Sequence, residues 1–253
     1  MLNPLRRRAP LLLLALIPAS VAISLPVSAQ RPARFAEAQL FLELNDTDGD
    51  LGLHAAIDGD TWTRLTIESP DERTLLQVVT RGRLRAHGLT ELLFESAEPS
   101  FDELAPEEIL RRFPEGKYEI EGQLQDGGAI RSSAMLSHVL AARPGNVRVS
   151  GVAAAESCDA PVLPVVSTPV IIDWDPVTAH HPDIGRPGAI KVSGYQLFVE
   201  REDVKFSVDL PPAITEFEVP AAITSLASDF KFEIIVRTAA GNNTAVESCF
   251  IVR

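Results

Sequence analysis

Apolar side chains recur at every second position in many short runs of this chain. One run contains Leu40, Leu42 and Leu44, and a second, at 51–57, follows after a polar turn. Similar runs cover 75–80, 89–94, 118–124 and 130–140. Alternation with this period is typical of strands that bury one face and expose the other. The first part of the chain is therefore predicted to be antiparallel β-sheet.

Turn and helix signals punctuate these runs. Asp58-Gly59 predicts a tight hairpin, because both central residues of that turn need positive φ. Residues 106–113 predict one short helix, which begins at Pro106 and ends before Pro114. The expected role of this helix is to cover an open end of a β-sandwich.

A short linker at 141–145 divides the pattern into two. We expect a first β-sandwich-type domain over 30–143 and a second over 144–253, with the single short helix in the first. The fold class is therefore mainly β. We identify no known family in residues 30–143.

Three motifs in residues 144–253 resemble a fibronectin type III domain. Trp174-Asp175-Pro176 resembles the Trp-x-Pro that ends the second strand of that family, and Tyr195-x-Leu197-x-Val199 resembles its next long strand. The spacing from Phe230 to Gly241 resembles its sixth strand and glycine turn. The resemblance implies an immunoglobulin-like sandwich that serves in adhesion, as a spacer or as an accessory module. The expected core residues are Trp174, Tyr195, Phe230 and Phe232.

This chain departs from the family in two places. Phe230 stands where the family usually has a tyrosine whose hydroxyl bonds nearby backbone. Residues 153–169 form a long insertion between the first and second strands. We expect this insertion to fold over the edge of the last strand and to be held there by a Cys158–Cys249 disulfide, which would protect that edge.

The first 29 residues predict a signal peptide. Arg6, Arg7 and Arg8 precede an apolar run that continues to Val27-Ser28-Ala29, which fits a signal-peptidase site with a mature start at Gln30. Pro18 and Pro26 interrupt that run, which disfavours a stable membrane span. The predicted location is secreted or periplasmic, and the arginine-rich, alanine-rich composition hints at a bacterial source.

The negative net charge of the chain restricts the kinds of molecule that it can bind. Cleavage after residue 29 would remove three arginines and no acids, and would lower the formal net charge from −12 to −15. Such a chain lacks the clustered cations that nucleic acids and anionic membranes require. The partners we expect are a protein or a glycan of the cell envelope.

Two cysteines, Cys158 and Cys249, occur in this predicted export product. An even number in an oxidising compartment favours one disulfide, and two unpaired buried thiols are the alternative.

The turn Asp46-Thr47-Asp48-Gly49-Asp50 is the sharpest local motif. Asp46, Asp48 and Asp50 match the first three ligand positions of an EF-hand calcium loop. The sixth position is Leu51 and the twelfth is Ile57, where that loop needs glycine and glutamate. The preference of turns for aspartate and glycine is enough to explain these residues. Calcium binding is kept as an alternative hypothesis, and we expect no other cofactor.

Other clusters favour a solvated surface over chemistry. His180, His181 and Asp183 are interpreted as a loop between strands, because adjacent histidines point in different directions. Glu91 and Glu95 share one face of a strand, and Glu98 lies just beyond its end. These glutamates fit a solvated strand face as well as they fit acid–base catalysis on a sugar. We name no catalytic residue.

The leading hypothesis is an exported non-enzymatic binding, adhesion or spacer protein whose recognition surface lies in the irregular region 91–113. The alternatives are an envelope hydrolase acting on carbohydrate or peptide, with acids from the first domain, and a calcium-dependent adhesion module.

Overall fold

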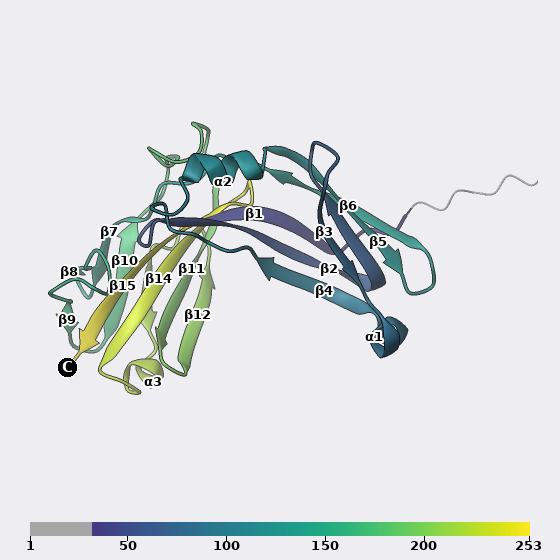
Figure 1. Cartoon of the computed structure of the whole chain (residues 1–253). Coiled ribbons are helices and arrows are strands. Elements are labelled where there is room, and N and C mark those ends of the chain that lie inside the picture. The colour runs from purple at the N-terminus through teal and green to yellow at the C-terminus, as the bar shows by residue number, and fades with distance from the viewer. Residues whose placement is uncertain (1–31) are drawn as a thin grey trace, which may run out of the picture. The chain divides into compact units, whose positions relative to one another are not determined.

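The computed structural model describes residues 32–253 (Figure 1), so the predicted signal peptide at 1–29 lies outside the described residues. The elements of the first half are β1 (Glu37–Asn45), β2 (Asp50–Glu68), β3 (Thr74–Val79), α1 (Gly82–His87), β4 (Leu89–Glu95), α2 (Pro106–Arg112), β5 (Gly116–Leu124) and β6 (Ala129–Leu136). The elements of the second half are β7 (Gly145–Val149), β8 (Val152–Ala153), β9 (Val165–Val166), β10 (Val170–Asp175), β11 (Val192–Arg201), β12 (Val204–Leu210), β13 (Glu216–Val219), α3 (Ala221–Thr224), β14 (Asp229–Thr238) and β15 (Asn243–Val252). None of the helices in residues 32–253 is long and apolar enough to cross a membrane.

One sheet runs through both halves. Its strand order is β12-β11-β14-β15-β1-β2-β5-β6, with β3 and β4 also paired to β2 and β9 to β15. A smaller sheet has the order β13-β10-β7-β8. The link between the halves is a parallel pairing in which Glu43, Leu44 and Asn45 of β1 lie opposite Asn243, Thr244 and Ala245 of β15.

The predicted hairpin at Asp58-Gly59 is wrong, because β2 runs without a turn from Asp50 to Glu68. Its first part pairs with β1 and β4, and its second part pairs with β3 and β5, with register shifts between Asp58 and Trp62. Gly59 serves close packing instead of a turn, since a Cβ there would lie 2.9 Å from the Phe35 ring and 3.2 Å from Ile130.

The first half contains a second helix that the sequence did not reveal. Helix α1 buries no residue, so it has none of the apolar periodicity that signals a packed helix. Helix α2 matches the predicted helix, and its Ile109 and Leu110 are buried in the core of the first half.

The second half has a fibronectin type III-like fold. When the two-residue strands β8 and β9 are left out of the count, the second strand of this half is β10 and the third is β11. The sixth is β14 and the seventh is β15, in agreement with the order that the motifs predicted. Strands β7, β10 and β13 form one layer, and β12, β11, β14 and β15 form the other. The core between the two layers contains Trp174, Tyr195, Phe230 and Phe232, each at most 3% exposed.

Tyr195 makes a buried hydrogen bond to the backbone. Its hydroxyl accepts a hydrogen bond from the backbone N–H of Val177 at 2.9 Å. Phe230 instead stacks on Phe250, with ring centroids 5.5 Å apart.

The insertion at 153–169 covers the edge of β15. Strand β9 pairs in parallel with β15 at Ile251 and Val252, and the disulfide between Cys158 and Cys249 fastens the insertion there.

Buried apolar residues form two clusters, one drawn mainly from 35–140 and one from 141–250. Residues 32–253 nevertheless form one compact unit. The division into 30–143 and 144–253 remains a prediction.

Candidate binding surface

The predicted metal residues do not gather around one point. Asp46 accepts hydrogen bonds from His181 Nε2 at 2.8 Å and from Arg143 Nη1 at 3.0 Å. These partners, His181 first, hold the pKa of Asp46 below its usual value. Asp48 lies beside the Asn45 amide. Within residues 32–253, no three His, Cys, Asp or Glu side chains are arranged to hold a metal ion. Calcium binding by Asp46, Asp48 and Asp50 remains a prediction.

His181 is buried in the junction between the two halves, so the prediction of a solvated loop is wrong for this residue. Its Nδ1 accepts hydrogen bonds from the backbone N–H groups of Asp183 and Ile184 at 3.2 and 2.9 Å. Because Nδ1 is an acceptor, the hydrogen-bond network assigns the ring proton to Nε2, which donates to Asp46. His181 therefore connects the second half to the turn after β1.

Asn242 forms the centre of this junction. Its Oδ1 accepts from the backbone N–H of Leu42 at 2.9 Å, and its Nδ2 donates to the carbonyls of Ser137 and Val139 at 2.7 and 3.1 Å. Thr244 donates to the Ala141 carbonyl at 2.9 Å. Sequence reasoning missed these residues. Their signal was a run of three polar residues, 242–244, at the start of a strand that is otherwise mostly apolar.

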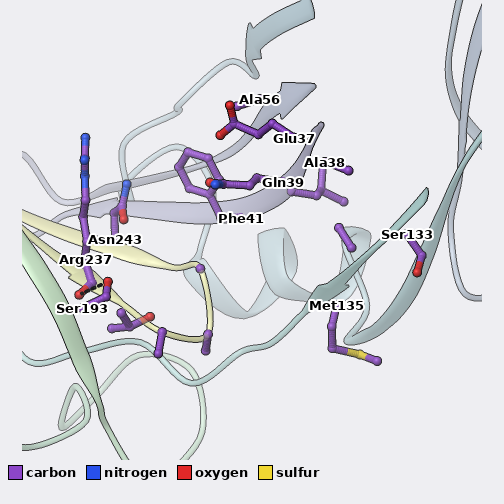
Figure 2. Close-up of a pocket in the computed structure, with 16 residues that line it drawn as sticks. Glu37, Ala38, Gln39, Phe41, Ala56, Ser133, Met135, Ser193, Arg237 and Asn243 are labelled. Atoms are coloured by element: carbon purple, nitrogen blue, oxygen red, sulfur yellow. Dashed lines mark hydrogen bonds between the residues drawn. The ribbon is translucent and has the colours of Figure 1, made fainter. Parts of the chain in front are cut away.

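A three-sided cleft opens beside this junction (Figure 2). Its volume is about 760 Å³. Its sides are β1 at residues 37–41, β6 at residues 133–135, and the turn between β14 and β15 at residues 238–241. Small side chains leave the space open, namely those of Ala38, Ala56, Ala134, Ala239 and Ala240. Leu40 lines the interior, and exposed Met135 stands at the rim.

The β1 side of the cleft is a free strand edge. Leu42 directs its N–H away from β2, toward Asn242. Alternate residues of an antiparallel strand point their backbone groups to the same side, so Ala38 and Leu40 point theirs into the cleft. In the described chain, β15 pairs with β1 only at Glu43–Asn45. The N–H and C=O groups of Ala38 and Leu40 therefore have no partner strand.

The β6 side is free in the same way. Arg131 donates its N–H to the Ala33 carbonyl, away from β5. By the same alternation, Ser133 and Met135 direct their backbone groups into the cleft. Within residues 32–253, two strand edges without a backbone partner thus border one space.

The outer face of the continuous sheet is acidic at the far end of β1 from the cleft, around Asn45 and Thr47. Glu43 lies opposite Asn243, and Glu233 lies opposite Glu247 on neighbouring strands. Burial, followed by repulsion from Glu247 and Glu43, raises the pKa of Glu233 to about 7. Burial, followed by repulsion from Glu98, raises the pKa of Asp50 to about 6. This face therefore favours cations.

Two carboxylates of the first half, Glu91 and Glu95, are four residues apart on one strand. Glu91 and Glu95 are exposed on β4 and lie about 13 Å apart along the strand, because a strand rises about 3.3 Å per residue. Glu98 bonds His54, with 2.9 Å between Oε1 and Nε2.

Comparison with known proteins assigns no family, since no family model and no curated protein matches the chain. Among solved structures, a segment of two fibronectin type III domains from chicken tenascin is similar at 11% identity and a TM-score of 0.29, over 86% of this chain and 98% of that one. A 1.5-MDa bacterial ice-binding adhesin is similar at 12% identity and a TM-score of 0.25, over 88% of this chain and 66% of that one. The tetra-tandem repeat of a large adhesion protein is similar at 14% identity and a TM-score of 0.27, over 86% of this chain and 50% of that one. Scores this low carry no argument about function, and the fold assignment rests on the strand order and motifs described above.

Proposed function

We propose that this chain is an exported, non-enzymatic binding or adhesion protein whose partner is a protein or a glycan of the cell envelope or extracellular space. The observation that carries the proposal is the junction. One sheet continues through both halves, and an open cleft with two free strand edges lies where they meet.

A stiff junction suits a binding role. The β1–β15 pairing, the buried Asn242 contacts and the Asp46–His181 bond each tie the halves together. Arg186 adds a salt bridge to Glu115 at 2.8 Å. A surface to which both halves contribute keeps its geometry only if the halves stay fixed, and preorganisation of this kind reduces the entropy lost on binding.

The disulfide supports export. Disulfides persist in oxidising compartments and are rare in reducing ones. The Cys158–Cys249 bond also fastens the strand edge at β15, where an exposed strand would be prone to aggregate outside the cell.

The test uses purified residues 30–253 coupled to beads and incubated with cell-envelope fractions. We expect saturable retention compared with beads that carry an unrelated protein of equal negative charge. Loss of retention after protease treatment of the fractions would identify a protein partner, and loss after periodate oxidation would identify a glycan. Retention equal to that of the acidic control would refute the proposal.

The hydrolase hypothesis is tested on the same material. Release of reducing sugar or of new amino termini from envelope fractions, abolished in Glu91→Gln, Glu95→Gln or Glu98→Gln, would overturn the non-enzymatic assignment. We expect no release above that of the fractions alone.

A further inference from the structure

Strand β4 leaves one of its two edges without a partner. Ser96 donates its backbone N–H to the Leu53 carbonyl on β2, and the pairing of Glu91–Glu95 with β2 keeps the same register. Alternate residues of an antiparallel strand direct their backbone groups to the same side. The N–H and C=O groups of Glu91, Leu93 and Glu95 therefore point away from β2, where no strand among residues 32–253 pairs with them.

This edge is accessible. In Figure 1, β4 forms the border of its part of the sheet, and β2 is the one strand that it pairs with among residues 32–253. Leu93 is 65% exposed, and Glu91 and Glu95 are also exposed. The free stretch from Glu91 to Glu95 is about 13 Å long, enough for a segment of about five residues. An extended peptide can satisfy such an edge by adding a strand to it.

The two faces of β4 differ in chemistry. Leu92 and Phe94 point to the inner face and pack against the core of the first half. Glu91, Leu93 and Glu95 point to the outer face. Successive side chains of an added strand also point to opposite faces. Its inner side chains would thus meet apolar neighbours, and its outer side chains would meet two carboxylates with a leucine between them.

The carboxylates next to this edge lack basic partners. Glu91 lies opposite Asp58 on β2, and Asp58 lies opposite Glu37 on β1, so three acids form one row across three strands. Within residues 32–253, none of the ion pairs includes this row or Glu95. Like charges directly opposite one another on neighbouring strands are destabilising. A basic side chain bound beside Glu91 would reduce that repulsion.

The same charges disfavour a second copy of this chain. Two β4 edges paired antiparallel about Leu93 would place Glu91 of each copy opposite Glu95 of the other. Charged side chains on an edge strand oppose self-association in this way. A basic segment of another protein would instead be attracted.

We propose that the free edge of β4 binds an extended segment of a partner protein as an antiparallel strand. Basic residues of that segment lie next to Glu91 and Glu95, and an apolar residue lies next to Leu93. This inference rests on the proposed binding function and names the partner class for it.

The test measures binding of the labelled peptide Ser-Lys-Val-Leu-Val-Lys-Ser to the purified chain by fluorescence anisotropy. In this peptide the lysines and the leucine share one face, and the valines share the other. We expect saturable binding, weaker binding at higher salt, and no binding of a copy with glutamate in place of lysine. Equal binding of the two peptides would overturn the choice of a basic partner.

Backbone methylation separates strand pairing from attraction between charges. In an antiparallel pairing about Leu93, the lysines and the leucine of the peptide direct their N–H groups toward β4, and the valines direct theirs away. N-methylation of the lysines and the leucine should weaken binding at least about tenfold, and N-methylation of the valines should not. Equal effects of the two modifications would overturn the proposed pairing.

Leu93→Pro blocks the edge with little effect on the fold. The N–H of Leu93 points away from β2, so proline removes no bond between the strands. Gln77→Pro is the matched control. Thr80 donates its N–H to the Thr63 carbonyl on β2, so Gln77, three residues earlier and exposed, directs its own away from β2. We expect at least about tenfold weaker peptide binding in Leu93→Pro and wild-type binding in Gln77→Pro.

Reversal of charge provides a second variant if Leu93→Pro fails to fold. The double variant Glu91→Lys, Glu95→Lys changes two exposed side chains, and it should lose the lysine peptide and bind the glutamate peptide. The control is Glu216→Lys, Glu218→Lys on β13, an exposed pair whose reversal changes the net charge equally. This control should keep the wild-type preference. The same preference in both double variants would overturn the inference.

The outcomes separate the two proposals. Retention on envelope fractions without peptide binding, or equal peptide binding by Leu93→Pro and Gln77→Pro, overturns the inference about β4 and leaves the binding function standing. Failure of both retention and peptide binding refutes both. A wild-type dimer in sedimentation velocity that Leu93→Pro abolishes would make the occupant a second copy and overturn the choice of a basic partner.

Discussion

The side-chain amide oxygen of Asn242 accepts a hydrogen bond from the backbone N–H of Leu42, at 2.9 Å and across 200 residues of sequence. With its two bonds to the carbonyls of Ser137 and Val139, this one buried amide joins the last strand to both ends of the first half. Its position beside the cleft means that the same contact contributes to stability and to the geometry of the cleft.

Asn242→Ala should lower the free energy of unfolding by about 2–4 kcal/mol, because it leaves the Leu42 N–H and two carbonyls without partners in a buried site. Urea denaturation followed by tryptophan fluorescence measures the change. Asn243→Ala is the matched control and removes only the bond to Glu43 at 2.7 Å, so its cost should be about 1 kcal/mol. Equal losses in the two variants would contradict the central role of Asn242.

Tyr195→Phe should lower the free energy of unfolding by about 1–2 kcal/mol, because the buried N–H of Val177 loses its acceptor while the ring still fills its place. Chemical denaturation measures this loss. Phe230→Tyr is the companion variant, and it should bring no gain because Phe230 is buried against Phe250, where an added hydroxyl costs free energy unless it finds a partner. A stabilised Phe230→Tyr would show that the corner beside Phe230 still lacks a bond.

Replacing both cysteines by serine should lower the free energy of unfolding by about 2–4 kcal/mol, since the disulfide joins residues 91 apart. Urea midpoints of the double variant and of the wild type with reductant should agree. If reduction left the wild-type midpoint unchanged, the insertion at 153–169 would be held by strand pairing alone.

Glu233→Gln should stabilise the protein in a pH-dependent way. Burial raises the pKa of Glu233 from its usual value of 4.5 to about 7. Below pH 4.5 the carboxyl is protonated in both states and costs nothing. As pH rises from 4.5 to 7, the unfolded state releases its proton first, so the free energy of unfolding falls.

The variant should therefore gain about 1–3 kcal/mol at about pH 8 and almost nothing at about pH 4. Thermal or urea unfolding at both pH values measures this difference. Glu91→Gln, an exposed glutamate on the same sheet, is the control and should show no such dependence. A gain of equal size at both pH values would exclude desolvation of Glu233 as its cause.

Calcium at ~5 mM, above the dissociation constants of extracellular calcium modules, should leave the melting temperature of the wild type equal to that in chelator. The physical reason is that Asp46 already bonds Arg143 and His181. Scanning calorimetry checks this. A rise with calcium that Asp48→Asn abolishes would establish the calcium hypothesis instead.

The alternation of apolar residues predicted most strands. Pro106 and Pro114 marked the short helix expected at 106–113, and the motifs of the second half indicated the core positions of Trp174, Tyr195, Phe230 and Phe232. The strands follow from local spacing, because a period of two makes one strand face apolar wherever the strand finally packs. The same local signals failed at Asp58-Gly59, where a glycine that serves close packing with Phe35 resembles a hairpin turn. They also failed at α1, which buries nothing and so leaves no apolar pattern.

The sequence alone thus determined that this protein is built of alternating strands, that its second half is a fibronectin type III-like sandwich, and that Cys158 and Cys249 could pair. Only the tertiary structure decided that β1 lies against β15, that His181 and Asn242 are buried between the halves, and that two free edges meet at one cleft. The reason is that these relationships join residues about 100 to 200 positions apart. Backbone pairing between distant strands depends on which edges the folded chain brings together, and no local pattern of side chains records that choice.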